Sequence, residues 1–458
     1  MTVRNRILSS AVSLMLSRGI NLFGQIVLVP VFATAWGAAG YGEWVALTAM
    51  ASYLNYSGIG LAPTVRADMA MEHARGDHEG MRRTFQSAAT LILVSSATVS
   101  LGFWLGNAVA PFGSLLHFKF LDRLSVTIIL ACFAVQIPFN LLNGIFYSAI
   151  ASTGRFALTN RIDAGKQAVE FSSIIFLVSV VHARPSAMVM VYPVTAIVTF
   201  VINYSLVVFG PVPLINLPWS LDLFALRRLW RPIAGSLLLN FGYNGLVVQA
   251  PRIIIAMTIG PVAVAVYSVA AMLIRLARIP LEIPIIATLV EVSSAFGRGD
   301  MLAIHNILKR VSQITFWLAL MGTPFLIFLG PFIVGIWTKG RIHLPTPLLI
   351  PLSLGTVLYA LSVVGQEALL AANKITKASV WLIILAVPYI ALCAVMSSTL
   401  NLLGTAIAVM LFEGSFGVLV IAVALDTFDV KRSELLSYIA PPSPSAAVRW
   451  LGRRFGKG

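Results

Sequence analysis

The chain has 458 residues, of which 58% are hydrophobic and only 11% are charged, and its mean hydropathy is +0.90. Soluble globular domains carry about 25% charged residues, so the composition indicates a membrane protein and argues against a soluble hydrolase, a transferase or a nucleic-acid binder. The net charge of +15 would suit a polyanion-binding protein, but basic residues in a multi-pass membrane protein usually mark its cytoplasmic loops.

Apolar runs separated by charged or Pro/Gly-rich segments predict about twelve membrane-spanning helices, because each span needs about 20 residues. The expected spans are 8–35, 43–64, 85–110, 125–150, 167–183, 187–210, 233–259, 261–290, 311–336, 347–372, 378–397 and 402–425. These runs lack the two-residue alternation of a β-barrel strand. The first run is too long for a signal peptide, so we expect an all-α polytopic membrane protein whose first span is retained.

The Lys and Arg residues are distributed unequally between the two sides of these predicted spans. Most of the 32 fall on the side that holds both termini. The smaller set on the opposite side consists of Lys119, Arg123, Arg184, Lys339 and Arg341. By the positive-inside rule, both termini are expected in the cytoplasm, and the 111–124 loop is expected in the periplasm.

The two halves of the chain, with six predicted spans each, repeat the same landmarks in the same order. An Arg-Gly-Asp tripeptide at 75–77 follows the second span, and another at 298–300 follows the eighth. Each precedes a basic pair, at 82–83 and at 309–310. Because six is an even number, both halves enter the membrane from the same side. We therefore expect two parallel six-helix bundles around a central cavity, which is open to each side of the membrane in turn.

These landmarks divide the chain into four predicted parts. The N-terminal bundle covers 1–210 and the C-terminal bundle covers 233–425. The intervening segment, 211–232, combines Trp and Leu residues with three arginines, as is typical of an amphipathic helix on a membrane surface. We interpret it as a cytoplasmic linker and 426–458 as a basic cytoplasmic tail.

A resemblance to a known family rests on two long stretches. They are 37–83, which begins GAAGYGEWVALTAM, and its counterpart 260–310, which begins GPVAVAVYSVAAML. Both resemble the polysaccharide-biosynthesis flippases of the multidrug/oligosaccharidyl-lipid/polysaccharide exporter superfamily, and the resemblance extends over nearly the whole chain. The family often has an acidic residue near the end of the seventh span, where this chain has Pro251 and Arg252.

The resemblance implies a transporter rather than an enzyme. Its cargo would be undecaprenyl-diphosphate-linked oligosaccharide units of O-antigen lipopolysaccharide or exopolysaccharide, carried across a bacterial inner membrane. The implied partners are this lipid-linked substrate, the membrane lipids, and the polymerase and glycosyltransferases of polysaccharide synthesis. A cation-coupled multidrug exporter of the same superfamily is the alternative, and it would need acidic rather than basic residues around its cargo.

Arginines inside the predicted spans are the candidate ligands of a diphosphate, because guanidinium groups bind its oxygens bidentately. They are Arg18, Arg252, Arg275 and Arg278. An unpaired Arg at the bilayer centre costs about 2.5–3.5 kcal/mol, so each needs a partner or a watery cavity. The structural alternatives are a hydrogen-bonded cluster between spans for Arg18, a pair with Glu282 for Arg278, and an acidic partner elsewhere for Arg275.

Polar and acidic residues in the spans complete the candidate site. Asn21 and Gln25 share a helix face with Arg18, and we expect them to line the cavity together with Asn55, Asn140 and Asn244. The candidates for ion coupling are Glu282, Glu367 and Glu413, of which the last two have no basic residue within one turn of their own helix. A structural carboxyl, or core packing in the case of the amides, is the alternative.

The sequence gives no sign of an enzyme, a metal site or a cofactor. The six His residues have no metal-ligand spacing, and no Walker-type phosphate loop is found. A membrane-bound lipid-synthesis enzyme would need a large periplasmic loop or a catalytic carboxylate pair, and the predicted 111–124 loop is too short. We therefore expect transport to be driven by an ion gradient or by the substrate's own concentration.

Overall fold

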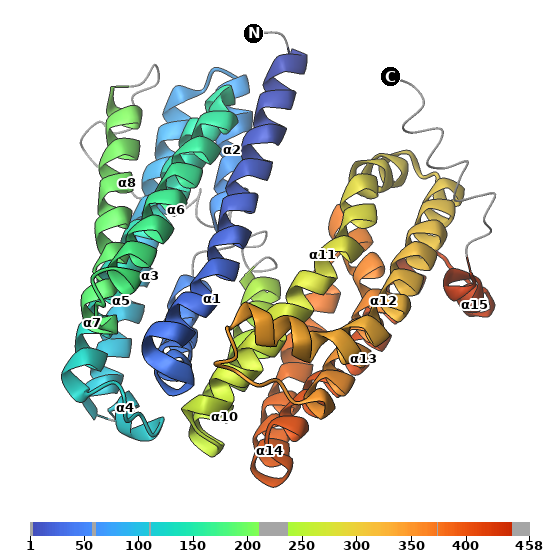
Figure 1. Cartoon of the computed structure of the whole chain (residues 1–458). Coiled ribbons are helices and arrows are strands. Elements are labelled where there is room, and N and C mark those ends of the chain that lie inside the picture. The colour runs from blue at the N-terminus through green and yellow to red at the C-terminus, as the bar shows by residue number, and fades with distance from the viewer. Residues whose placement is uncertain (1–2, 57–60, 110, 210–236, 373, 442–458) are drawn as a thin grey trace. The chain divides into compact units, whose positions relative to one another are not determined.

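The computed structural model describes residues 3–56, 61–109, 111–209, 237–372 and 374–441. These residues form helices and no strands (Figure 1). Eight of their helical segments are long and apolar enough to cross a membrane. The expected all-α polytopic membrane fold is confirmed.

Three helical segments are about twice as long as one crossing requires. They are α1 (Val3–Tyr56), the run from α5 through η1 to α6 (Arg123–Ser179) and α14 (Thr376–Thr427), with 54, 57 and 52 residues. Each would be about 80 Å long if straight, whereas the hydrocarbon core is about 30 Å thick. Positive φ angles at Gly37, Gly154 and Asn401 interrupt the three runs. Each run is therefore long enough to supply two of the twelve predicted spans.

The remaining long helices are unbroken. They are α3 (His78–Val109), α8 (Val191–Val208), α11 (Pro261–Arg298), α12 (Met301–Trp337) and α13 (Thr346–Ala371). The shorter elements are α2 (Leu61–Ala74), α4 (Phe112–Leu115), η1 (Ala151–Arg155), α7 (Pro185–Met188), η2 (Phe241–Gln249), α10 (Ala250–Thr258), η3 (Arg432–Glu434) and α15 (Leu435–Ile439).

The chain forms two compact units. The first consists of Met1–Val266 and Trp337–Ile342, and the second of Tyr267–Ile336 and His343–Gly458. In the first unit α1 packs against α6, and α5 packs against α8 and α3; in the second, α13 packs against α14. The segment η2–α10, which the sequence assigned to the C-terminal bundle, packs against α1 in the first unit. The predicted linker lies outside the described residues, as does the tail beyond 441.

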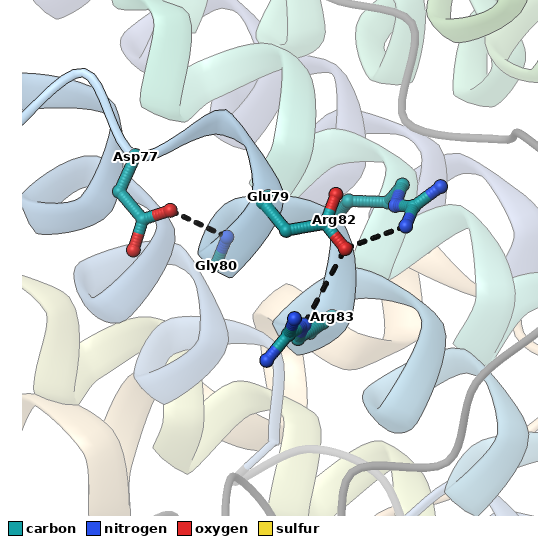
Figure 2. Close-up of polar contacts among 5 residues, drawn as sticks. All are labelled: Asp77, Glu79, Gly80, Arg82 and Arg83. Carbon is teal, nitrogen blue, oxygen red and sulfur yellow. Dashed lines mark hydrogen bonds and ion pairs between the residues drawn. The ribbon is translucent and has the colours of Figure 1, made fainter.

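The repeated Arg-Gly-Asp tripeptide builds the same turn in both units. Gly76 and Gly299 have φ angles of 74° and 72°, and glycine adopts this left-handed conformation without the steric cost of a side chain. The aspartate that follows caps the next helix: Asp77 Oδ1 accepts a hydrogen bond from the Gly80 amide at 2.8 Å (Figure 2). Asp300 Oδ1 accepts one from the Ala303 amide at 3.0 Å. The sequence repeat is thus also a repeat of local geometry.

The turn at 117–122 is fastened to the second half of α1 by one buried carboxylate. Glu43 is 1% exposed and accepts hydrogen bonds from the backbone amides of Lys119, Phe120 and Leu121 at 2.6, 2.9 and 2.7 Å. Three donors satisfy a charge that would otherwise be costly to bury. This loop is therefore anchored to the helix that follows the break at Gly37.

Two prolines within helical segments, Pro251 and Pro30, lie in different settings. Pro251 lies within the continuous helical segment 237–258, where the π-helical η2 passes into α10, and it cannot donate the backbone hydrogen bond that another residue would make there. Pro30 lies inside α1 and leaves the carbonyl of Ile26 without its helical donor. Trp337 Nε1 donates a hydrogen bond to that carbonyl at 2.9 Å. The Trp337–Ile342 segment is thereby bonded to α1 within the first unit.

Candidate functional site

A polar cluster in the first unit joins α1 to α6 through Asp163. The Oδ2 atom of Asp163 accepts hydrogen bonds from Ser17 Oγ at 2.8 Å and from Gln167 Nε2 at 2.6 Å. Ser17 is 6% exposed. The carboxylate of Asp163 is therefore held by neutral donors, and no salt bridge to it is found among the described residues.

Arg18 follows Ser17 in α1 but takes no part in this cluster. Its side chain is exposed, and it has no hydrogen-bond or ion-pair partner in the part of the chain that the structure describes. Asn21 and Gln25 bond to each other, with Gln25 Nε2 donating to Asn21 Oδ1 at 2.6 Å. The interhelical hydrogen bonds considered for Arg18 are made by its neighbour Ser17 instead.

A second polar group connects α5, α6 and α8. Lys166 Nζ donates to Asn140 Oδ1 at 2.6 Å, and Thr195 Oγ1 donates to Glu170 Oε2 at 3.1 Å. The sequence placed the start of the fifth span at 167, directly after Lys166, but α6 already begins at Phe156, so Lys166 lies within a helix. The charged residues that resembled a loop have their partners inside the bundle.

The second unit contains a buried ion pair. Arg278 Nη1 donates to Glu413 Oε1 at 2.9 Å, and the two side chains are 15% and 3% exposed. The Arg278 guanidinium also lies over the Tyr359 ring, 4.2 Å from its centroid, and the Tyr359 hydroxyl donates to Glu282 Oε1 at 3.4 Å. The pairing of Arg278 with Glu282 considered from the sequence is wrong, because the partner comes from α14 rather than from its own helix.

Arg275 and Glu367 are the other candidates in this unit. Arg275 is exposed on α11, one turn before Arg278. Glu367 is half-buried on α13, where it lines a small, mostly apolar cavity together with Thr288 and Val364. Glu367 has no hydrogen-bond or ion-pair partner among the described residues, in contrast to Glu413.

The remaining candidates interact within their own helical segment or lie outside the described side chains. Arg252 donates to Gln249 Oε1 and to the Val248 carbonyl. Asn244 Nδ2 donates to Asn240 Oδ1 at 3.5 Å. The side chain of Asn55 is not among those the structure describes.

Two arginines are exposed within the described spans, whereas two acidic side chains there are bonded to neighbouring residues. Asp163 and Glu413 have their charges engaged by partners inside their own units. Arg18 and Arg275 are exposed, and charged side chains in spans usually face a bundle interior or a water-filled cavity. Such arginines can bind an anion that carries several oxygens, as phosphate and carboxylate groups do.

The sequence reasoning did not include several residues of these clusters, among them Ser17, Asp163, Gln167, Thr195 and Tyr359. Asp163 and Gln167 are four residues apart and therefore share a helix face. That signal was available in the sequence, but the late start assigned to the fifth span placed both residues at or before its beginning. No sequence pattern brings Tyr359 to Arg278.

Solved structures with the same fold are transporters. An inward-facing multidrug resistance MATE family transporter of the MOP superfamily is 13% identical, with a TM-score of 0.72 over 91% of this chain and 94% of that chain. An outward-facing MATE family transporter is 12% identical, with a TM-score of 0.64 over 93% and 95%.

A third similar structure is a MOP superfamily transporter from Pyrococcus furiosus, for which a reversed polarity of the binding pocket suggests a different function. It is 12% identical, with a TM-score of 0.61 over 94% of this chain and 96% of that chain. No family model matches the sequence, and no curated protein sequence does so either. At these identities the likeness establishes the fold, which is that of MOP superfamily transporters.

Proposed function

We propose that this chain is a membrane transporter that exports an anionic, diphosphate-linked lipid oligosaccharide by alternating access. The main support for the proposal is that the exposed charged side chains Arg18 and Arg275 in the spans are positive. Arg18 and Arg275 are exposed, whereas Glu413 is buried against Arg278 and Asp163 is held by Ser17 and Gln167.

The guanidinium groups explain how such a cargo would be recognised. A diphosphate offers several charged oxygens, and the planar fork of Arg matches two of them at once. An arginine facing a watery cavity keeps its hydration until the cargo arrives, so the cost of holding the charge in the membrane is reduced. Arg18 has no protein partner that would compete with the anion in the described part of the chain.

Alternating access is supported by the fold. The similar transporters include one in an inward-facing and one in an outward-facing conformation. A fold that is found in two such states in its relatives is suited to carry a cargo without opening a continuous pore. For this chain we infer the same type of movement.

The positive-inside rule sets the direction in this proposal. Both termini lie in the cytoplasm of a bacterial cell, the 111–124 loop lies in the periplasm, and the membrane is the inner membrane. Cysteine replacements at His117 and Ser443 test this topology. A membrane-impermeant thiol reagent should label position 117 and not position 443 in intact cells, and the reverse result would contradict the orientation.

Export of cationic drugs is the second candidate. Two of the similar structures are multidrug resistance transporters, and Glu367 is a carboxylate that has no partner among the described residues. The cavity that Glu367 lines is small, however, and its other lining residues are apolar except Thr288. We favour the anionic cargo because two exposed arginines lie in the described spans.

Transport in proteoliposomes distinguishes the two candidates. The assay measures translocation of a short-chain polyprenyl-diphosphate oligosaccharide and, in parallel, of a cationic dye. We expect Arg18→Gln and Arg275→Gln each to reduce oligosaccharide translocation at least tenfold, and Arg18→Lys to retain part of it, because Lys keeps the charge and loses the fork.

Arg75→Gln is the matched control, since Arg75 is exposed in the turn between α2 and α3. It should leave translocation unchanged. Wild-type translocation by both Gln variants at equal protein amount would contradict the anion site. Dye transport that is lost in Glu367→Gln, without any oligosaccharide transport by the wild type, would favour the drug exporter.

A further inference from the structure

A groove enclosing about 630 Å³, its open mouth included, lies in the second unit next to the C-terminal helix α15. Its walls come from three spans and from α15. Leu308 belongs to α12, Leu361 to α13 and Ile421 to α14, while Leu435 and Ile439 come from α15. All of its lining residues are apolar or glycine except Ser312 and Tyr438. The groove therefore suits an extended hydrocarbon chain rather than a sugar or an ion.

Polar contacts to α12 hold α15 in this place. Gln313 Nε2 donates to the Ser437 carbonyl at 2.9 Å, and Trp317 Nε1 donates to the Ile439 carbonyl at 3.0 Å. These bonds satisfy carbonyls at the end of a five-residue helix, which has little stability of its own. The helix is thus fixed to α12 through its backbone, while its side chains line the groove.

One polar atom of the groove lacks a protein partner. The Tyr438 hydroxyl is buried and has no hydrogen-bond partner in the described structure. Burial raises the pKa of Tyr438 to about 12, so the phenol is neutral at physiological pH and can donate its proton in a hydrogen bond. Buried donors are rarely left without an acceptor, so an oxygen from a bound molecule would fit here.

Basic residues flank the groove in the sequence. Lys431 and Arg432 are exposed between the groove residues Val430 and Leu435, and Lys309 and Arg310 directly follow Leu308. The acidic residues of this region are Asp426, Asp429 and Glu434, of which Asp426 is ion-paired with Lys377 at 3.7 Å. Basic residues outnumber acidic ones, which favours a negatively charged headgroup.

We propose that this groove binds an anionic phospholipid of the surrounding bilayer. One acyl chain occupies the apolar groove, the Tyr438 hydroxyl donates to an ester or phosphate oxygen, and Lys431 and Arg432 hold the phosphate. Leu436 of α15 is 75% exposed, and an exposed apolar side chain of this kind is typical of a helix that lies at the membrane interface. The site does not depend on the identity of the transported cargo.

Native mass spectrometry of the full-length protein in detergent tests the proposal. The probes are phosphatidylglycerol, phosphatidylcholine with the same acyl chains, glycerol 3-phosphate and undecaprenyl phosphate. We expect one phosphatidylglycerol to bind at least tenfold more tightly than phosphatidylcholine, and glycerol 3-phosphate not to bind. The double variant Lys431→Gln/Arg432→Gln should lose this preference, since each basic residue near an anionic lipid contributes roughly fivefold in affinity.

Two further variants test the groove itself. Ser312→Phe places a ring among the lining residues and should weaken both phospholipids at least tenfold, whereas Leu320→Phe, at an exposed position of the same helix, should change neither. Tyr438→Phe keeps the shape and removes only the hydroxyl, so it should weaken phosphatidylglycerol severalfold even if Ser312→Phe fails to fold.

Three results would overturn the proposal. They are equal affinity of the wild type for the two phospholipids, unchanged binding in both Ser312→Phe and Tyr438→Phe, and tighter binding of undecaprenyl phosphate than of phosphatidylglycerol. The last result would assign the groove to a polyprenyl lipid. Loss of transport in Arg18→Gln with intact phosphatidylglycerol binding would support both proposals separately.

Discussion

Breaking the ion pair between Glu413 and Arg278 should strongly destabilise the second unit. The two side chains are 3% and 15% exposed and their charged atoms are 2.9 Å apart, so Glu413→Gln leaves a guanidinium that water hardly reaches. Removing one partner of a buried pair costs about 3–5 kcal/mol. We expect about 3 kcal/mol, because the Gln oxygen still accepts a hydrogen bond and the Tyr359 ring, 4.2 Å away, still attracts the cation by about 0.5–2 kcal/mol.

Denaturation in detergent, followed by intrinsic fluorescence, measures this effect. Glu434→Gln serves as the control because Glu434 is exposed, and it should leave stability unchanged. The double variant Arg278→Met/Glu413→Leu removes both charges and should recover to within about 1 kcal/mol of the wild type. A Glu413→Gln variant as stable as the wild type, or a double variant no better than the single one, would refute the reasoning.

The turns and the anchored loop give two more predictions. Gly76→Ala and Gly299→Ala should each cost about 1–2 kcal/mol, since both glycines have φ angles above 70° and an L-residue is strained there; the midpoint of denaturation in detergent measures this loss. Glu43→Gln should cost about 2–3 kcal/mol, because a neutral amide accepts the three backbone donors more weakly. Faster hydrogen exchange at 119–121 in Glu43→Gln would support this, and unchanged exchange would contradict it.

Most of the fold follows from patterns that are local in the sequence. Span number depends on the length of apolar runs, and the turns at 75–77 and 298–300 depend on a glycine and an aspartate in adjacent positions. The fifth span was placed too late because the basic residues Arg161 and Lys166 were assigned to a loop before it. Those charges lie in a helix whose neighbours supply Ser9, Ser17 and Asn140 as partners, and partners on other helices cannot be identified from one segment.

The candidate site was less predictable for the same reason. Arg18 and Arg275 were recognisable as charges inside apolar runs, and both are exposed in the structure. The partner of Arg278 could not be recognised from the sequence, because Glu413 is 135 residues away and only helix packing brings the two together. The nearer Glu282 satisfied the spacing rule for a single helix, yet it is bonded by Tyr359 of α13.

The bond between Trp337 and α1 leads to a prediction about Pro30. Proline cannot donate to the Ile26 carbonyl, and the Trp337 indole donates to it instead, at 2.9 Å. Trp337→Phe should therefore cost about 1–3 kcal/mol, the penalty for leaving an acceptor without its partner. In the Pro30→Ala background a backbone N–H can restore the helical bond, so the same replacement should cost about 1 kcal/mol less there.

A double-mutant cycle on stability in detergent measures this difference directly. The effect of Pro30→Ala on the unfolded chain is present in both arms and cancels. A coupling of about 1 kcal/mol between the two positions would mean that Trp337 compensates for the proline. Strictly additive effects would contradict that role, and Trp337 would then contribute only its packing against α1.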